Sequence, residues 1–142
     1  MSEQVATFLA SINTNEETAS PAQLSDAKAY ATCYEWYITT QKVLPENAAL
    51  AAKVWVNKYA LHDKSGVCLE NTPEDMWNRI ATTLAGVEQD RAGYPNKNEY
   101  KQMFLDALKD FKYTPQGSGM FSLGNDYVNA SASNCFVLPP PE

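Results

Sequence analysis

The sequence predicts a mainly α-helical fold for residues 1–112, followed by a loop and one β-strand in residues 113–142. Apolar residues recur at three- and four-residue steps through five stretches of the first part, as on the buried face of a helix. Residues typical of helix starts precede most of these stretches. The second part instead combines a proline with two glycines, and its apolar run stops at three consecutive prolines.

Two helices are expected in the N-terminal third of the chain. Residues 3–12 form a short amphipathic stretch, and the polar residues 13–21 after it indicate a linker. Ser25 and Asp26 are residue types that cap helices, so we expect the second helix to start there and to end near Thr40. Its apolar stripe consists of Ala29, Cys33, Trp36 and Tyr37.

A third helix is expected to begin at Pro45, because proline suits the first helical turn, where its missing N–H leaves no partner unpaired. Its apolar stripe consists of Ala48, Ala51, Trp55 and Tyr59. Residues 63–66 then predict a turn that ends in glycine. The short apolar run 67–69 after this turn indicates one arm of a small hairpin.

The clearest helix start is the pair Thr72 and Pro73. Threonine is a capping residue, proline suits the first helical position, and the two acids that follow lie near the positive end of the helix. A regular apolar stripe continues as far as Val87. Asn98 or Asn96 can cap the next helix, whose stripe consists of Tyr100, Phe104, Leu108 and Phe111.

Beyond residue 112 the pattern changes. Residues 114–119 hold one proline and two glycines, which predicts that no regular helix forms there. Residues 133–138 contain an apolar run that is typical of a buried strand. Because a lone strand is not stable in water, we expect this one to pair with strands of a further domain.

Composition and charge exclude several classes of function. The chain is 44% hydrophobic and 20% charged, which is ordinary for a globular protein and too apolar for extended disorder. Its net charge of -6 argues against nucleic-acid binding, which needs a basic face. No apolar stretch approaches the roughly 20 residues of a membrane helix, and the N-terminus lacks the pattern of a signal peptide. We therefore expect a cytoplasmic protein that binds neither nucleic acid nor membrane.

The three cysteines, Cys33, Cys68 and Cys135, are widely spaced and form no C-x-x-C motif. Such a sparse, odd set is a poor disulfide framework and suits a reducing compartment. A zinc site would require all three cysteines to converge with His62, the only histidine, and their spacing argues against this. We therefore expect no metal site, and we interpret His62 as a surface residue at a helix end.

Two groups of motifs follow each other along residues 44–142. The first comprises a helix with a tyrosine near its end, a charged turn with glycine, a Glu-x-Thr-Pro helix start and an Arg-Ile-Ala segment, at residues 47–50, 59–61, 63–66, 70–76 and 79–81. The second comprises an aromatic segment with a proline and a Ser-Asn-Cys strand, at residues 111–118 and 132–139. Together they resemble the N-terminal part of ribonucleotide reductase catalytic subunits, most closely the adenosylcobalamin-dependent (class II) type.

The resemblance implies a domain organisation. In that family a helical domain precedes a ten-stranded α/β barrel, so residues 1–43 are expected to be an N-terminal helical extension and residues 44–112 the helical domain. Residues 113–142 are then the loop and first strand of an incomplete barrel. The intact enzyme reduces ribonucleotides to deoxyribonucleotides by thiol and radical chemistry. Adenosylcobalamin is the cofactor implied for that enzyme, and none is expected to bind to this part of it.

The resemblance also implies site residues. Cys135, in the Ser-Asn-Cys strand, is expected to be a redox-active thiol, because a dithiol that closes to a disulfide can supply two electrons to the ribose. Thr114, Ser133 and Asn134 are expected to bind the substrate. The second reducing thiol and the radical cysteine would lie in the remainder of the barrel. We therefore expect the chain alone to be inactive, with that remainder, a ribonucleotide and a thioredoxin-like reductant as its partners.

Three other interpretations stay open, one for Cys135 and two for the whole chain. A cysteine in a strand is most often a small buried hydrophobe. A free-standing helical module that docks on a partner's sheet edge through residues 135–138 would need no redox role. A helical domain without retained activity would bind neither nucleotides nor a partner.

Overall fold

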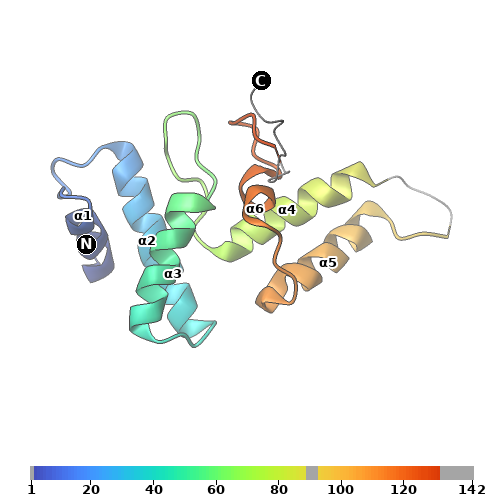
Figure 1. The fold of residues 1–142 in the computed structure, drawn as a ribbon, viewed down its shortest axis with the longest axis horizontal. Helices are drawn as coiled ribbons and strands as arrows, with labels where there is room; N and C mark the ends of the chain where they lie inside the picture. Colours follow the sequence, from blue (N-terminus) through green and yellow to red (C-terminus); the bar gives the residue numbers. More distant parts are fainter. Residues whose placement is uncertain (1, 89–92, 132–142) are drawn as a thin grey trace, which may run out of the picture.

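The structure is a computed structural model that describes residues 2–88 and 93–131. Within these ranges it contains α-helices and one short 3-10 turn, Lys109–Phe111 (Figure 1). The helices are α1 (Glu3–Ser11), α2 (Pro21–Thr39), α3 (Pro45–Lys58), α4 (Pro73–Val87), α5 (Lys97–Leu108) and α6 (Gly117–Ser122). Extended pairing among the described residues is limited to one antiparallel bridge, between His62 and Cys68. The prediction of a mainly helical chain is confirmed for this part.

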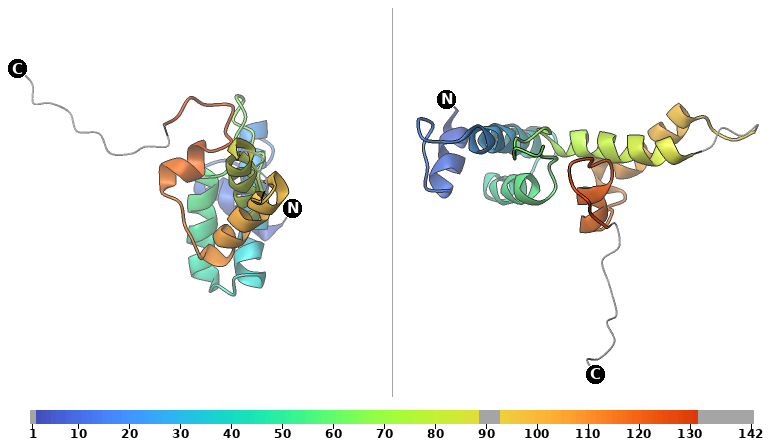
Figure 2. Two further views of the ribbon diagram at one scale, coloured as in Figure 1. Left: turned by 90° about the vertical axis from the view of Figure 1, so that its right-hand side faces the viewer. Right: turned by 90° about the horizontal axis from the view of Figure 1, so that it is seen from above.

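The helices form two groups that lie end to end along the longest axis of the molecule (Figures 1 and 2). In the first group α1 and α3 both pack against α2, and in the second α4 and α5 pack against each other. The short helix α6 lies beside α4, to which Arg79 joins it by hydrogen bonds to the Met120 carbonyl oxygen. The loop of residues 59–72 connects the two groups.

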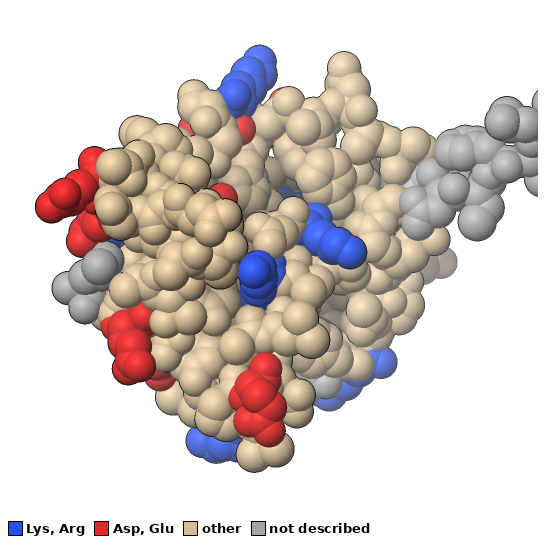
Figure 3. All heavy atoms as spheres, turned by 60° about the vertical axis from the view of Figure 1, so that its left-hand side comes forward, with Lys and Arg blue, Asp and Glu red and all other residues tan. Residues whose placement is uncertain are grey.

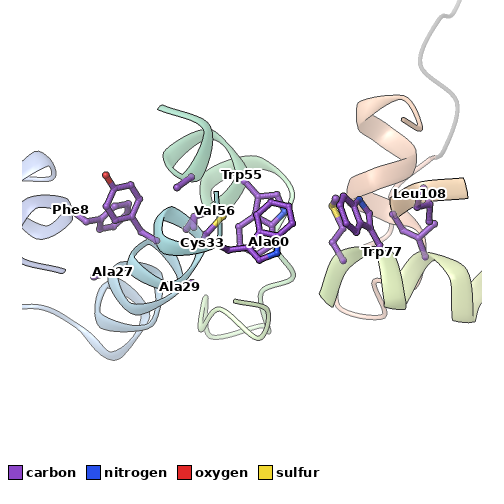
Figure 4. Close-up of a cluster of buried hydrophobic side chains, with 14 of the residues drawn as sticks. Phe8, Ala27, Ala29, Cys33, Trp55, Val56, Ala60, Trp77 and Leu108 are labelled. Atoms are coloured by element: carbon purple, nitrogen blue, oxygen red, sulfur yellow. The ribbon is translucent and has the colours of Figure 1, made fainter. Parts of the chain in front are cut away.

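One apolar core runs through both groups. Its fully buried members include Cys33 on α2, Val56 on α3 and Ile80 on α4. Figure 4 shows the side chains from α1–α3 together, with Trp77 and Leu108 on the neighbouring helices. The groups are joined by Trp36 and Trp77, whose rings meet edge to face with centroids 5.8 Å apart. Trp36 and Trp55, which lie on the apolar stripes expected from the sequence, are both buried, and so is Trp77.

Helix α2 begins earlier than the sequence analysis predicts. The cap is Ser20, whose side chain accepts from the Gln23 N–H while the Gln23 side chain accepts from the Ser20 N–H. Pro21 occupies the first helical position. The prediction of a cap at Ser25 and Asp26 was wrong, because this capping box satisfies the end of the helix one turn earlier.

The segment after residue 112 also differs from its prediction. A regular helix was not expected in residues 114–119, yet α6 starts at Gly117. The helix is short, and its residue Met120 packs on the core together with Leu123, which follows its end. Packing of these two side chains outweighs the low helix propensity of glycine. The strand predicted in residues 133–138 lies outside the described residues.

None of the helices in the described ranges is both long enough and apolar enough to cross a membrane.

The core predicts a sharp contrast between two positions on α4. Ile80 is fully buried, so Ile80→Ala should lower the free energy of unfolding by about 2–5 kcal/mol through lost burial and the cavity left behind. Val87 is 76% exposed, so Val87→Ala should change it by less than about 0.5 kcal/mol. Urea unfolding followed by circular dichroism measures both, and equal losses would contradict this core.

Candidate functional site

The structure describes one of the four predicted site residues. Thr114 is exposed and lines a groove, whereas Ser133, Asn134 and Cys135 lie outside the described residues. Thr114 is thus the one predicted site residue whose place is described, and the roles of all four residues stay predictions.

The groove beside Thr114 has a volume of about 410 Å³ and a mainly apolar lining. It lies between α3, the start of α4 and the segment of residues 111–120, and it is lined by Tyr37, Asn47, Leu50, Ala51, Val54, Trp55, Tyr59, Pro73, Met76, Phe111, Thr114 and Met120. Among the described residues the buried Nε1 of Trp55 has no hydrogen-bond partner. A concave apolar lining with a few polar groups is the usual character of a small-ligand site.

Next to this groove, Glu70 and Arg79 form a buried ion pair. Arg79 Nε donates to Glu70 Oε1 at 2.7 Å, and the side chains are only 9% and 6% exposed. Sequence analysis placed both residues in motifs but assigned them no contact. The sequence did carry a signal for this contact, because an acid just before a helix start and an arginine two turns into that helix can reach each other.

The ion pair holds three segments together through backbone carbonyl and amide groups. Glu70 Oε2 accepts from the Leu61 N–H at 2.9 Å. Arg79 donates to the carbonyl oxygens of Tyr59 at 3.3 Å, Met120 at 3.2 Å and Leu123. Removing either charge would therefore leave the other buried, and would also free the ends of α3 and α6.

Gly124 allows α6 to approach α4 this closely. Its φ is +70°, and a Cβ at this position would lie 2.7 Å from Arg79 Cγ and would also clash with Thr83 Oγ1. Both the left-handed backbone and the lack of space require glycine here.

A second polar cluster surrounds His62, which is partly buried and not a free surface residue as predicted. His62 Nε2 lies 2.9 Å from Asp26 Oδ1, and Nδ1 lies 2.9 Å from the Ala60 carbonyl oxygen. Hydrogen bonds with Asp26 and then with Cys68 raise the pKa of His62 to about 10, although burial opposes this. Sequence spacing could not reveal the cluster, because Asp26 is 36 residues away in the chain.

Cys33, the other cysteine among the described residues, has a thiol of low reactivity. Cys33 is fully buried in the core, and burial, followed by the neighbouring Cys68, raises the pKa of its thiol to about 12. A thiol with so high a pKa is a poor nucleophile at neutral pH.

On the face shown in Figure 3, acidic and basic side chains are scattered over a mainly uncharged surface, and the basic ones do not gather into one patch.

Residues 46–127 match the family described as the ribonucleotide reductase, all-alpha domain. The chain belongs to this family. The matched range includes α3 except for Pro45, the ion pair of Glu70 and Arg79, α6, and every lining residue of the groove except Tyr37, whereas α1 and α2 precede it. Searches of curated proteins and of solved structures returned no match.

The ion pair predicts a large effect from a single truncation. Arg79→Met should lower the free energy of unfolding by about 3–5 kcal/mol, because it leaves the Glu70 carboxylate buried without its partner. Lys112→Met, which removes an exposed cation, should change it by less than about 0.5 kcal/mol. Urea unfolding of the full chain measures both, and a similar small loss for Arg79→Met would show that the pair is dispensable.

Two glycines of the same region predict changes of opposite sign. Gly124→Ala should destabilise the domain because the new Cβ clashes with Arg79 and Thr83. Gly86→Ala should stabilise it by about 0.5–1 kcal/mol, because Gly86 is helical and nothing lies within 4 Å of the place that its Cβ would take. Thermal melting gives the order of the three proteins, and a Gly124→Ala variant as stable as the parent would refute the close approach.

Proposed function

We propose that this all-alpha domain is the N-terminal part of a ribonucleotide reductase catalytic subunit in which Cys135 is one of the two reducing thiols. The observation that carries the proposal is the family match at residues 46–127, followed along the chain by the Ser-Asn-Cys motif at residues 133–135. The all-alpha domain supports the assignment to this enzyme, and the motif supports the assignment of the thiol.

The reaction needs two thiols beside the ribose. The 2′ carbon–oxygen bond breaks and its oxygen leaves as water, a carbon–hydrogen bond forms in its place, and two thiols close to one disulfide. The sugar thereby gains two electrons and the dithiol loses them. Cys135 supplies one sulfur, and a thioredoxin-like reductant then reopens the disulfide for the next turnover.

The polar residues around Cys135 would position the substrate. Ser133 and Asn134 carry hydrogen-bond donors and acceptors suited to ribose or phosphate oxygens. Thr114 is exposed at the groove, so its hydroxyl is accessible to a phosphate. Holding a substrate rigidly against the reacting sulfur is the main contribution such residues make to rate.

The other two cysteines do not complete the dithiol in this proposal. Cys33 is enclosed in the core, and Cys68 lies in the loop beside His62. The second reducing thiol and the radical cysteine would therefore come from the remainder of the barrel, and the chain alone would be inactive. The complete enzyme would work in the cytoplasm, where a reducing pool restores its thiols.

Adenosylcobalamin would serve the intact class II enzyme. The groove beside Thr114, with a volume of about 410 Å³, is too small for a corrin with its nucleotide loop, so in this proposal the cofactor binds to the remainder of the enzyme. We assign no step of the reaction to residues of this domain through that cofactor.

The proposal predicts activity only on reconstitution. The chain should form no deoxyribonucleotide alone, and should do so when combined with a barrel-bearing reductase chain from the same organism, ribonucleotide, adenosylcobalamin and a dithiol. Cys135→Ser should then lower the turnover to the background level while binding of the two chains, measured by size-exclusion chromatography, stays intact.

Cys33→Ala serves as the matched control, because it removes a cysteine that the proposal leaves out of the chemistry; its fold is checked by circular dichroism. Full activity of the Cys135→Ser combination would remove Cys135 from the site. Binding of the two chains without any reductase activity would favour the interaction module instead.

A further inference from the structure

Asp26, His62 and Cys68 bring three metal-ligating side chains together, away from the groove and from the buried ion pair. Their ligand atoms all lie within 4.8 Å of one another, and all three residues are partly buried. Carboxylate oxygen, imidazole nitrogen and thiolate sulfur are the donors that proteins use for Zn²⁺. We propose that this cluster is a Zn²⁺ site that fastens the loop of residues 61–69 to α2.

The backbone sets His62 and Cys68 side by side. Backbone hydrogen bonds of 3.0 and 2.8 Å flank the pair, one joining residues 63 and 67 and the other residues 61 and 69. This pattern makes His62 and Cys68 a directly opposed, non-hydrogen-bonded antiparallel pair. The side chains of such a pair lie on one face, with Cβ atoms about 4.5–5.5 Å apart.

The turn between these two residues is built to keep that arrangement. Asp63 Oδ1 accepts from the N–H groups of Ser65 at 2.8 Å and Val67 at 3.0 Å. Gly66 takes the left-handed conformation, with φ of +80°. Both ligands on the loop are therefore fixed by local geometry before any ion binds.

Helix α2 supplies the third ligand, and a side chain next to that ligand accepts a hydrogen bond from the backbone of the loop. The Cys68 N–H donates to Ser25 Oγ at 2.8 Å, so the loop is already anchored one residue from Asp26. Asp26 Oδ1 lies 2.9 Å from His62 Nε2. Bringing the three donors onto one ion then requires movements of side chains and not of the backbone.

The imidazole of His62 is oriented as a metal ligand. Its Nδ1 faces the Ala60 carbonyl oxygen at 2.9 Å, and because a carbonyl can only accept, Nδ1 carries a proton. Histidine ligands commonly donate their second N–H to such a carbonyl, which fixes the tautomer and leaves Nε2 for the metal. Here Nε2 faces Asp26, so an ion bound between them would replace the proton that they now share and release it to solvent.

The donor set selects the ion. Zn²⁺ binds nitrogen, oxygen and sulfur at about 2.0–2.3 Å, which places tetrahedral donors about 3–4 Å from one another. The distance between His62 Nε2 and Asp26 Oδ1 is close to this range, and Cys68 Sγ needs only a shift of its side chain. The soft sulfur disfavours Mg²⁺ and Ca²⁺. The fourth position stays open to water, since the His62 and Asp26 side chains are 29% and 25% exposed.

This site would join a helix that precedes the matched range to a loop that lies within it. Asp26 lies on α2, before the matched range, whereas His62 and Cys68 lie within it. The inference does not rest on the proposed reductase chemistry, because all three ligands lie in the described helical part.

Titration of the full chain with Co²⁺, a spectroscopic substitute for Zn²⁺, tests the site. One equivalent should produce a thiolate-to-cobalt charge-transfer absorption in the near ultraviolet, and Zn²⁺ should abolish it. Cys68→Ser should remove the absorption and weaken Zn²⁺ binding by more than about 100-fold, since loss of a ligand costs more than loss of a supporting contact. Cys135→Ser removes a different thiol and should leave both readouts unchanged.

An absorption that is missing in the parent, that persists in Cys68→Ser or that disappears in Cys135→Ser would overturn the proposal. If circular dichroism shows Cys68→Ser to be unfolded, Asp26→Asn decides the matter, because it keeps the thiol and the turn. It should weaken Zn²⁺ binding by about tenfold or more, and an unchanged affinity would refute Asp26 as a ligand.

Discussion

The arrangement of the second helical group depends on one buried ion pair, between Glu70 and Arg79. Two charges this far from water are tolerated only where hydrogen bonds satisfy both groups. Here those hydrogen bonds go to backbone atoms of segments that precede and follow α4, so the cost of burial is offset by contacts that also define where α3 ends and where α6 lies. The pair therefore helps to fix the position of α6, because Arg79 donates to carbonyl oxygens within and just after that helix.

Much of the helical fold follows from local signals in the sequence. Pro45 and the pair Thr72 and Pro73 begin helices where predicted, because a proline at the first position fixes the backbone and leaves no donor unpaired. Ser20 was missed as a cap because it lies near the end of the largely polar stretch 13–21 that was interpreted as a linker. Helix α6 was missed because its stability comes from packing on α4, and propensity alone gives no sign of such packing.

The candidate sites were less predictable than the helices. Thr114 was singled out by resemblance, but the groove that it lines is formed by α3, α4 and a later segment, and no spacing in the sequence encodes that meeting. His62 was interpreted as a surface residue because Asp26 and Cys68 reach it only after α2 and the loop have packed together. Glu70 and Arg79 both lie within motifs that the sequence shows. Their contact, however, depends on the path of the backbone between them.

The first two helices have a further consequence for how this domain is defined. They precede the matched range, but α2 packs along α3, and Ala52 and Val56 have no exposed surface. A chain that started at the edge of the homologous segment would present these side chains to water, together with the face of Trp77 that now meets Trp36. The matched range is thus smaller than the set of helices that share this core.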